Sequence, residues 1–159
     1  MKHFVAAGER RVGKAEGMFA VLGIGSCVIV VLYDRATQVG GMAHILLPDP
    51  SYNEHSARRW RYATTAIPGL VDEVVAAGAL HGRLTARLVG GASMFQELLP
   101  KNEPNIGERN IAAARSVLAS GCIPVVGEDV GGDVGRSVFF KLSDGRVRVT
   151  AYGREHVEI

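Results

Sequence analysis

Residues 21–44 read VLGIGSCVIVVLYDRATQVGGMAH, and this stretch decides the fold that we predict for the chain. It holds the apolar run 28–33 and most of the run 39–47, with the polar residues 34–37 between them. Two short β-branched runs around a polar turn are typical of a β-hairpin. We therefore expect two neighbouring antiparallel strands around which the rest of the chain is built.

The register of this hairpin brings a thiol and an imidazole together. If the turn is centred between Arg35 and Ala36, Cys27 lies directly opposite His44. Opposed residues of an antiparallel pair share a face and have Cβ atoms about 4.5–5.5 Å apart, within reach of a thiol–imidazole hydrogen bond. The pair Gly40-Gly41 leaves a second register open, because glycine inside a strand often marks a bulge that shifts the pairing by one residue.

Further apolar runs predict the remaining strands. An alternating or continuous run of four to eight apolar residues, bounded by glycine or polar residues, is typical of a strand. The additional strands that we expect cover residues 4–5, 18–24, 84–89, 122–126, 136–142 and 146–152. Residues 128–132 are expected to form a polar turn.

A first helix follows the loop 48–51. Apolar residues recur there at helical spacing until Gly78, and Asn53 or Ser56 is expected to cap the start. Pro68 lies inside the pattern and is expected to kink the helix or split it into two, because proline lacks the N–H of the helical hydrogen bond.

A second helix is expected from Asn105 to Gly121, with a short helical piece over residues 94–99 before it. Together these elements predict an α/β fold of the α+β type, a compact sandwich of mostly antiparallel strands with two main helices. At 159 residues and 47% hydrophobic content, the chain fits a single domain over residues 1–159.

Charge and hydropathy exclude several classes of protein. A net charge of +2 is too small for nucleic-acid binding. The basic clusters Arg10-Arg11 with Lys14, and Arg58-Arg59 with Arg61, are expected to be solvated faces, with docking to an acidic partner as the minority interpretation. The uncharged residues 17–33 are too short and too β-branched for a spanning helix. No signal peptide is visible, so we expect a cytoplasmic protein.

Cys27 is the candidate for chemistry. A thiol beside an imidazole in a protein with reduced cysteines is a candidate nucleophile, and N–H groups of the turn Gly25-Ser26-Cys27 could hold an oxyanion. Cys122 is expected to be a small buried residue of an apolar strand. The other histidines, at positions 3, 55, 81 and 156, are expected at the surface. Neither a metal site nor a phosphate-binding or dinucleotide-binding motif has the required spacing, so no cofactor is expected.

Several motifs together resemble the CheD family of chemoreceptor glutamine deamidases. The resemblance covers nearly the whole chain, and its most specific part is a Gly-Ser-Cys block with a histidine 17 residues after the cysteine. The matching blocks are Gly23-Ile24-Gly25-Ser26-Cys27, Gly41-Met42-Ala43-His44, Leu47-Pro48, residues 90–95 (GGASMF), Asn105-Ile106-Gly107, Arg109-Asn110, Glu128-Asp129, Gly131-Gly132 and Arg136-Ser137.

The resemblance implies a cytoplasmic hydrolase that converts glutamine side chains of methyl-accepting chemotaxis receptors to glutamate, with methyl-esterase activity on the same sites as an additional reaction. It implies Cys27 as nucleophile and His44 as base, no cofactor, and a CheC-type phosphatase as a further partner. The family's third active-site residue is a threonine at the position of Val21, and valine has no hydroxyl to orient the imidazole. A backbone carbonyl, Ser26 or Ser93 is then the expected substitute.

Two other functions stay open at the level of sequence. The chain could act chiefly as a binding partner of receptors or of a CheC-type phosphatase, with catalysis weakened by Val21. A general cysteine protease or small amidase would use the same pair of residues, but the sequence offers no sign of a peptide-binding groove. Deamidation is the function that the motifs favour.

Overall fold

The structure is a computed structural model of the chain, and it describes residues 1–50, 56–95, 98 and 103–159. One sheet consists, in spatial order, of β1 (Lys2–Phe4), β3 (Met18–Ile24), β8 (Arg136–Lys141), β9 (Val147–Ala151) and β10 (Val157–Glu158). The second consists of β2 (Arg10–Lys14), β5 (Val39–Ile45), β4 (Val28–Asp34), β6 (Thr85–Gly90) and β7 (Val125–Val130). The helices are α1 (Ala63–Ala76), α2 (Ile106–Ser120) and the short 3-10 helices η1 (Ser56–Arg61) and η2 (His81–Arg83).

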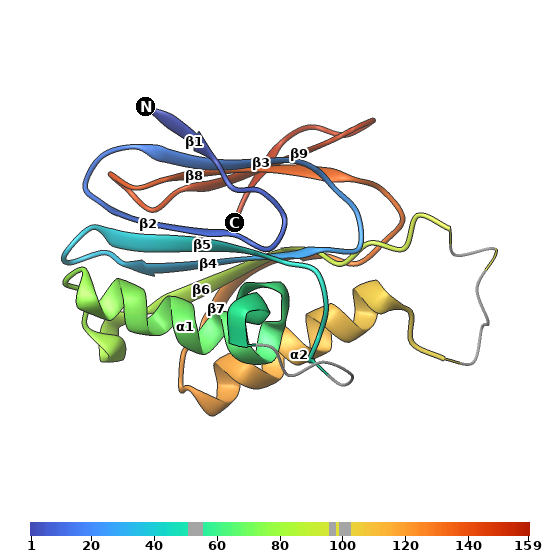
Figure 1. Cartoon of the computed structure of the whole chain (residues 1–159). Coiled ribbons are helices and arrows are strands. Elements are labelled where there is room, and N and C mark those ends of the chain that lie inside the picture. Colours follow the sequence, from blue (N-terminus) through green and yellow to red (C-terminus); the bar gives the residue numbers. More distant parts are fainter. Residues whose placement is uncertain (51–55, 96–97, 99–102) are drawn as a thin grey trace.

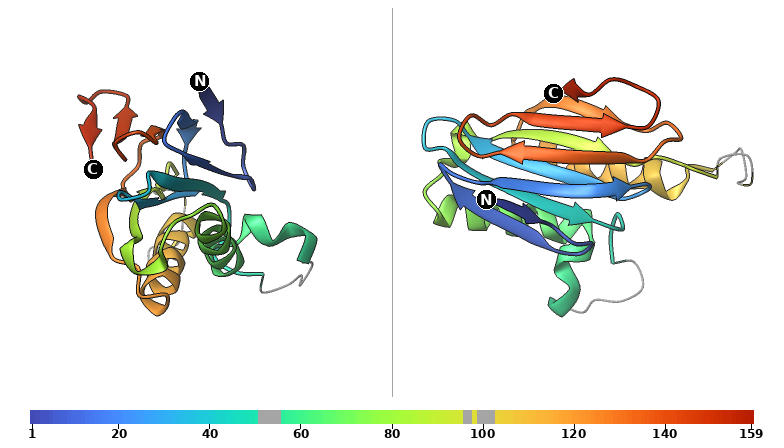
Figure 2. Two further views of the ribbon diagram at one scale, coloured as in Figure 1. Left: turned by 90° about the vertical axis from the view of Figure 1, so that its left-hand side faces the viewer. Right: turned by 90° about the horizontal axis from the view of Figure 1, so that it is seen from above.

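These elements form three layers, with the two sheets stacked and both α-helices below the second sheet (Figure 1). The strands β1 and β3 pair in parallel, as do β6 and β7, whereas all other paired strands of the described residues are antiparallel. The predicted α+β sandwich of mostly antiparallel strands with two main helices is confirmed. Figure 2 shows the same layers from two further sides, and the C-terminal residue Ile159 reaches the second sheet, where Arg87 of β6 donates to its carbonyl oxygen at 2.8 Å.

The middle layer explains why the central sequence is so apolar. Every residue of β4 and β5 is buried, because one face meets the helices and the other meets the first sheet. Val30 and Leu32 belong to the core below, which they share with α1 and α2. Val31 and Tyr33 belong to the core between the sheets, where Phe140 of β8 packs against the Tyr33 ring at a centroid distance of 5.7 Å.

The hairpin forms as predicted, but its predicted register is wrong by two residues. His44 pairs with Ile29, not with Cys27, and the pairing runs on without interruption to Asp34 and Val39. The turn holds residues 35–38, one residue further along than expected, and Gln38 adopts a positive φ of 56° there. An offset of two residues keeps every side chain on its expected face, because side chains alternate with a period of two.

The glycine pair in β5 does not mark a bulge. A Cβ on Gly40 would lie 2.6 Å from the Phe140 ring, and a Cβ on Gly41 would lie 2.9 Å from side-chain atoms of Leu70 and Val74 in α1. The two glycines therefore let the layers above and below approach the strand closely, and the ladder between β4 and β5 stays regular.

The structure corrects the prediction around the last helix. The predicted strand at residues 122–126 begins only at Val125, and it continues through residues 128–130, which were expected in a turn. Cys122 is exposed, lies in a turn and has a positive φ of 56°. The chain leaving α2 turns at this left-handed residue. Cys122 therefore belongs to the turn and not to the strand that the apolar sequence suggested. The short strands β2 and β10 were also missed, because neither has an apolar run.

The helix α1 begins later than predicted and is not split at Pro68. Its N-cap is Tyr62, which makes no side-chain capping bond, and the 3-10 helix η1 precedes it. The predicted cap Asn53 lies outside the described residues. Pro68 and Thr64, whose carbonyl would be its helical partner, are both exposed, so water can satisfy the carbonyl that proline leaves unpaired.

The helix α2 has the predicted bounds and a capped start. Asn105 Oδ1 accepts a hydrogen bond from the Glu108 N–H at 2.9 Å. Half of the short helix predicted over residues 94–99 lies outside the described residues, and Met94 and Phe95 form a turn.

The two arginine clusters are exposed, as expected for solvated faces. Arg11 is exposed, and so are Arg58, Arg59 and Arg61. Arg10 donates to Glu73 at 2.8 Å, and its guanidinium lies 4.2 Å from the centre of the Trp60 ring. Among the described residues, no helix has the length and apolar character that a membrane crossing requires.

Candidate active site

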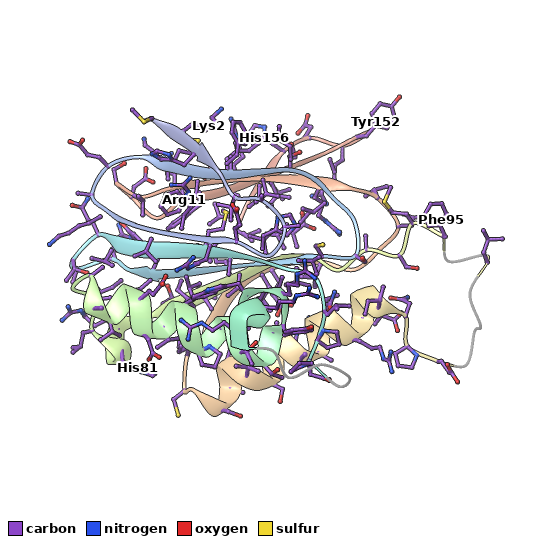
Figure 3. All side chains as sticks on the ribbon, in the orientation of Figure 1. Lys2, Arg11, His81, Phe95, Tyr152 and His156 are labelled. Carbon is purple, nitrogen blue, oxygen red and sulfur yellow. The ribbon has the colours of Figure 1, made fainter. Side chains whose placement is uncertain are left out.

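Cys27 lies at one end of the sandwich, directly before the first residue of β4. The connection from β3 to β4 meets the connection that follows β6 there, through hydrogen bonds from Gly91 N–H to Cys27 O (2.8 Å) and from Ala92 N–H to Gly25 O (2.9 Å). Phe95 marks this end of the molecule in Figure 3, whereas His81 lies at the other end. Main-chain hydrogen bonds between loops therefore hold the thiol in place.

Three successive carbonyl groups around Cys27 are fixed. The carbonyls of Gly25 and Cys27 accept the two bonds just named, and the carbonyl of Ser26 accepts a bond of 2.9 Å from Asn110 Nδ2. In the described part of the chain, the N–H groups of Ser26 and Cys27 donate to no other residue, although the N–H of Cys27 interacts with its own thiol sulfur. Neither donor is therefore tied to a neighbouring residue.

His44 lies on the adjacent strand and shares a face with the cysteine. It pairs with Ile29, two residues beyond Cys27, so continuing the pleat by one residue beyond β4 makes Cys27 and His44 a diagonal pair. Diagonal neighbours are roughly 7–8 Å apart between Cα atoms. Within the described residues no hydrogen bond joins the two side chains, and catalytic bonds are often long before substrate binds.

The imidazole of His44 is oriented by the main chain. Its Nδ1 donates to the carbonyl of Val5 at 3.1 Å. Because a carbonyl only accepts, Nδ1 carries the proton and the neutral ring keeps the lone pair on Nε2. The Val5 N–H in turn donates to Ala20 O of β3 at 2.9 Å, which ties this carbonyl into the first sheet.

Burial favours the uncharged form of both groups. The side chain of His44 is only 8% exposed, and burial lowers its pKa, although the hydrogen bond to Val5 acts in the opposite direction. Burial likewise raises the pKa of the Cys27 thiol, with a smaller opposing effect from the N–H group of Cys27 itself. Both shifts point to a neutral thiol beside a neutral imidazole near pH 7.

From the sequence, three groups could orient His44 in place of a hydroxyl at position 21: a backbone carbonyl, Ser26 and Ser93. Val21 lies in β3 opposite Val138, is 4% exposed and belongs to the core between the sheets. The hydroxyl groups of Ser26 and Ser93 make no hydrogen bond to His44 in the described structure. The partner of the ring is the Val5 carbonyl, the backbone alternative.

Asn110 was not predicted as part of the site, although the sequence analysis noted it within a matching block. It is fully buried in α2, and its Nδ2 donates to both Ser26 O and Leu46 O at 2.9 Å. A polar residue at an inward helical position, next to Ile111, was the signal that sequence offered for it. The Val5 carbonyl had no such signal, because every residue has a carbonyl.

None of the other histidines of the described residues forms a hydrogen bond with Cys27. His81 and His156 are exposed, as predicted, and His81 Nε2 donates to Gly121 O at 2.7 Å. His3 is half-buried, with its ring 6.4 Å from that of Phe19, and His55 lies outside the described residues. Among the described residues, no cluster of three or more histidine, cysteine, aspartate or glutamate side chains could hold a metal ion.

The free thiol and the oriented imidazole lie on neighbouring chain segments at one end of the sandwich. These features place the chain in the class of two-sheet α+β proteins that carry a candidate cysteine–histidine pair. Comparison with known proteins narrows this class. The chain belongs to the CheD family: residues 46–151 match the family described as CheD chemotactic sensory transduction.

Curated relatives cover more of the chain than this match. One is the probable chemoreceptor glutamine deamidase CheD of Pyrococcus abyssi, 43% identical over 91% of this chain and 88% of its own length. Another, from Caldanaerobacter subterraneus, has the same description and is 39% identical over 94% of this chain and 92% of its own. Among solved structures, the Bacillus licheniformis hypothetical protein YfiH matches 80% of this chain and 58% of its own at 14% identity, with a TM-score of 0.47.

Proposed function

We propose that the chain is a chemoreceptor glutamine deamidase that acts as one domain over residues 1–159, with Cys27 as nucleophile and His44 as general base. The observation that carries this proposal is the Nδ1–H bond of His44 to the Val5 carbonyl. It leaves Nε2 as the only proton acceptor of the ring, on a strand neighbouring the thiol. Relatives named probable chemoreceptor glutamine deamidase supply the substrate class.

The first half of the reaction forms an acyl-enzyme. His44 Nε2 takes the proton of Cys27 as the sulfur attacks the carboxamide carbon of a receptor glutamine. The C–N bond then breaks, His44 returns the proton to the nitrogen, and ammonia leaves. A thioester between Cys27 and the glutamyl side chain remains.

The second half hydrolyses this thioester. His44 takes a proton from water, the hydroxide oxygen attacks the thioester carbon, and the C–S bond breaks with return of the proton to sulfur. The product is glutamate, and no redox step or cofactor is involved. Methyl esters of the same glutamate side chains would react by the same steps with methanol as the leaving group.

An oxyanion site lies beside the nucleophile in this proposal. The N–H groups of Ser26 and Cys27, which donate to no other residue, would donate to the carbonyl oxygen of the substrate as negative charge develops on it. The carbonyl of Gly25 accepts a hydrogen bond from the Ala92 N–H, which holds the turn that carries these donors. Fixed donors of this kind cost no reorganisation during the reaction.

The partners follow from the substrate class. The cytoplasmic domains of methyl-accepting chemotaxis receptors would present the glutamines, and a CheC-type phosphatase is the additional partner that we propose to test. The open end of the sandwich at Cys27 carries exposed apolar side chains, Leu22, Met94 and Phe95 among them, which suits contact with a protein substrate.

Mass spectrometry tests the proposal directly. The protein is incubated with a receptor cytoplasmic fragment, and each converted glutamine should add roughly one dalton, since NH₂ is replaced by OH. We expect this gain with the wild type and with Cys122→Ala, which removes the exposed thiol, but not with Cys27→Ala.

The same experiment separates catalysis from binding. If wild type and Cys27→Ala leave identical receptor masses while a CheC-type phosphatase binds to both, the enzymatic proposal fails and the regulatory function replaces it. Loss of activity in Cys122→Ala would also contradict the assignment of the nucleophile.

A further inference from the structure

The side chain of Asn110 joins the two segments that carry the candidate pair. It is fully buried in the second turn of α2, between the helix and the second sheet. One of its bonds reaches the carbonyl of Ser26, the residue before Cys27, and the other reaches the carbonyl of Leu46, two residues after His44.

These two bonds begin where the strand ladder stops. Val28 and Ile45 are the last paired residues of β4 and β5. Beyond them, towards Cys27, the two strands form no further backbone pairing. Asn110 bridges the two chains just beyond this pair, with both donor–acceptor distances at 2.9 Å. A side chain from a helix therefore replaces the backbone hydrogen bonds that would otherwise hold the chains together here.

The bond to Ser26 also fixes the backbone of the cysteine. The carbonyl of Ser26 and the N–H of Cys27 belong to one peptide plane and point in opposite directions across it. Holding the carbonyl towards α2 turns the N–H of Cys27 away from the helix. The same bond thereby sets both the position of the thiol and the direction of a candidate oxyanion donor.

The helix that carries Asn110 is itself held tightly against this end of the sandwich. A Cβ on Gly107 would lie 2.4 Å from the carbonyl oxygen of Gly91, and Gly91 N–H binds the carbonyl of Cys27. The direct backbone contact leaves α2 little freedom to move relative to the cysteine loop.

The amide group is directed wholly at these two carbonyls. Because carbonyl oxygens only accept, Nδ2 must face them, and both of its protons are used. Its Oδ1 is buried and accepts no hydrogen bond within the described structure. A buried acceptor without a hydrogen bond is unfavourable. The contribution of the Asn110 side chain therefore lies in its two donor bonds, which hold the carbonyl groups of Ser26 and Leu46.

We propose that Asn110 is a positioning residue that fixes the Ser26–Cys27 peptide and the Leu46 chain, and thereby aligns Cys27 with His44. This inference rests on the proposed roles of the two residues. Misplacement of reacting groups by about 1 Å can cost about a hundredfold in rate. Removing the amide should therefore lower kcat far more than it changes KM, because the receptor does not contact a buried helix residue.

The test compares Asn110→Ala with a matched control, Leu118→Ala, which also truncates a fully buried side chain of α2 but touches neither carbonyl. At a temperature where both are folded, Asn110→Ala should lose roughly 10–100-fold in kcat for receptor deamidation with KM changed less than about threefold. Leu118→Ala should stay within about twofold in both. A folded Asn110→Ala with kcat within twofold of wild type would overturn the proposal.

A second readout measures alignment without the receptor. Iodoacetamide alkylation of Cys27 is compared with and without His44→Ala, once in wild type and once in Asn110→Ala. We expect His44 to accelerate alkylation in the wild type but to have almost no effect in the Asn110→Ala background, since a merely structural residue would leave the two effects additive. Equal acceleration in both backgrounds would refute the positioning role.

This cycle also separates the inference from the function on which it rests. If His44 does not accelerate alkylation in the wild type, the proposed pair fails. If it does, but equally in Asn110→Ala, only the positioning role fails.

Two further measurements apply if Asn110→Ala does not fold. Asn110→Thr keeps the volume and one donor, and should show an intermediate loss of the His44 effect. In the wild type, the Asn110 side-chain amide resonances should shift when Cys27 is alkylated, and unchanged resonances would count against the proposal.

Discussion

The imidazole of His44 is held by the main-chain carbonyl of Val5, whereas the resemblance to the family implies a threonine hydroxyl at position 21, which is valine here. The side chain of Val21 cannot donate or accept a hydrogen bond. The His44 ring still has a defined tautomer, because its Nδ1–H donates to the Val5 carbonyl. Nδ1–H bonded to a carbonyl is a common way to fix which nitrogen of histidine acts as base. The loss of the hydroxyl therefore need not remove the base.

Restoring the hydroxyl tests this account. We expect Val21→Thr to change kcat less than about threefold, because the Val5 carbonyl already occupies Nδ1. The variant should be destabilised by about 1–3 kcal/mol, since it buries a hydroxyl among apolar side chains. Kinetics on the receptor fragment and thermal unfolding measure the two effects. A rate gain well above tenfold would mean that the missing hydroxyl limits catalysis after all.

The pH dependence of deamidation follows from the burial of the pair. Only neutral His44 can take the thiol proton, and burial lowers its pKa, so kcat/KM should fall only when the pH drops below the usual range of histidine. Burial raises the pKa of Cys27, so thiolate formation should appear only above the usual thiol range. The expected profile is a broad plateau between the two limits.

A pH series of kcat/KM measures this profile, with thiolate absorbance of wild type minus Cys27→Ala as an independent titration. The same shift of His44 makes folding weaker in acid, since the unfolded histidine binds its proton more readily and stability falls as the pH drops through the usual histidine pKa. An acid limb at or above that pKa would contradict a buried neutral base.

The sequence pointed to the two candidate residues but not to the groups that hold them. Cys27 and His44 stood out because each is a reactive side chain at a strand end, and the hairpin pattern put them on one face. Val5 binds the His44 ring through its backbone carbonyl. Asn110 binds the carbonyl of Ser26, which is 84 positions away in the sequence. Such long-range backbone contacts leave no local pattern in a sequence.

At the scale of elements, the hairpin shows what periodicity can and cannot fix. The apolar runs gave the correct strands and faces, but the turn length, and with it the register, depended on Gln38 adopting a left-handed conformation. The glycines at 40 and 41 left a shifted register open at the level of sequence, and in the structure they serve packing against Phe140 and α1. A glycine's neighbours across layers decide its role, and a single sequence does not name them.

The contact of α2 with the cysteine loop gives an element-scale prediction. Gly107→Ala places a methyl group 2.4 Å from Gly91 O, so the helix must shift away from the loop. We expect a loss of about 1–3 kcal/mol in the free energy of unfolding, typical of overpacking, together with slower deamidation. Chemical denaturation and receptor assays measure these effects.

Gly82→Ala is the matched control, because a Cβ at Gly82 has no neighbour within 4 Å. It should leave activity unchanged and stability equal to or slightly above that of the wild type. Equal behaviour of the two glycine variants would show that α2 is not tightly coupled to the cysteine loop.

At the scale of the whole molecule, the two sheets share one interior through the central hairpin. Tyr33 of β4 donates its hydroxyl to Leu142 O at 2.7 Å, beyond the end of β8, and its ring packs on Phe140. The opposite face of β4 packs on both helices. Because one strand is buried by all three layers, we expect the layers to unfold together, consistent with the single domain that we propose.

Unfolding by denaturant tests this coupling with three probes. Far-ultraviolet circular dichroism reports the sheets, Trp60 fluorescence reports η1, where the ring lies beside Arg10 and Arg59, and Cys27 labelling reports the candidate site. The three transitions should coincide, as in two-state unfolding. A separate early transition of one probe would show that the chain contains independent units.

The most direct measurement of the central claim is the initial rate of ammonia release from a receptor cytoplasmic fragment. Wild type and Cys122→Ala should release ammonia at the same rate, in proportion to the glutamate that appears in the fragment. Cys27→Ala should fall to the background without protein, because no other group of the site can form the acyl-enzyme. Ammonia release by Cys27→Ala at the wild-type rate would contradict the account.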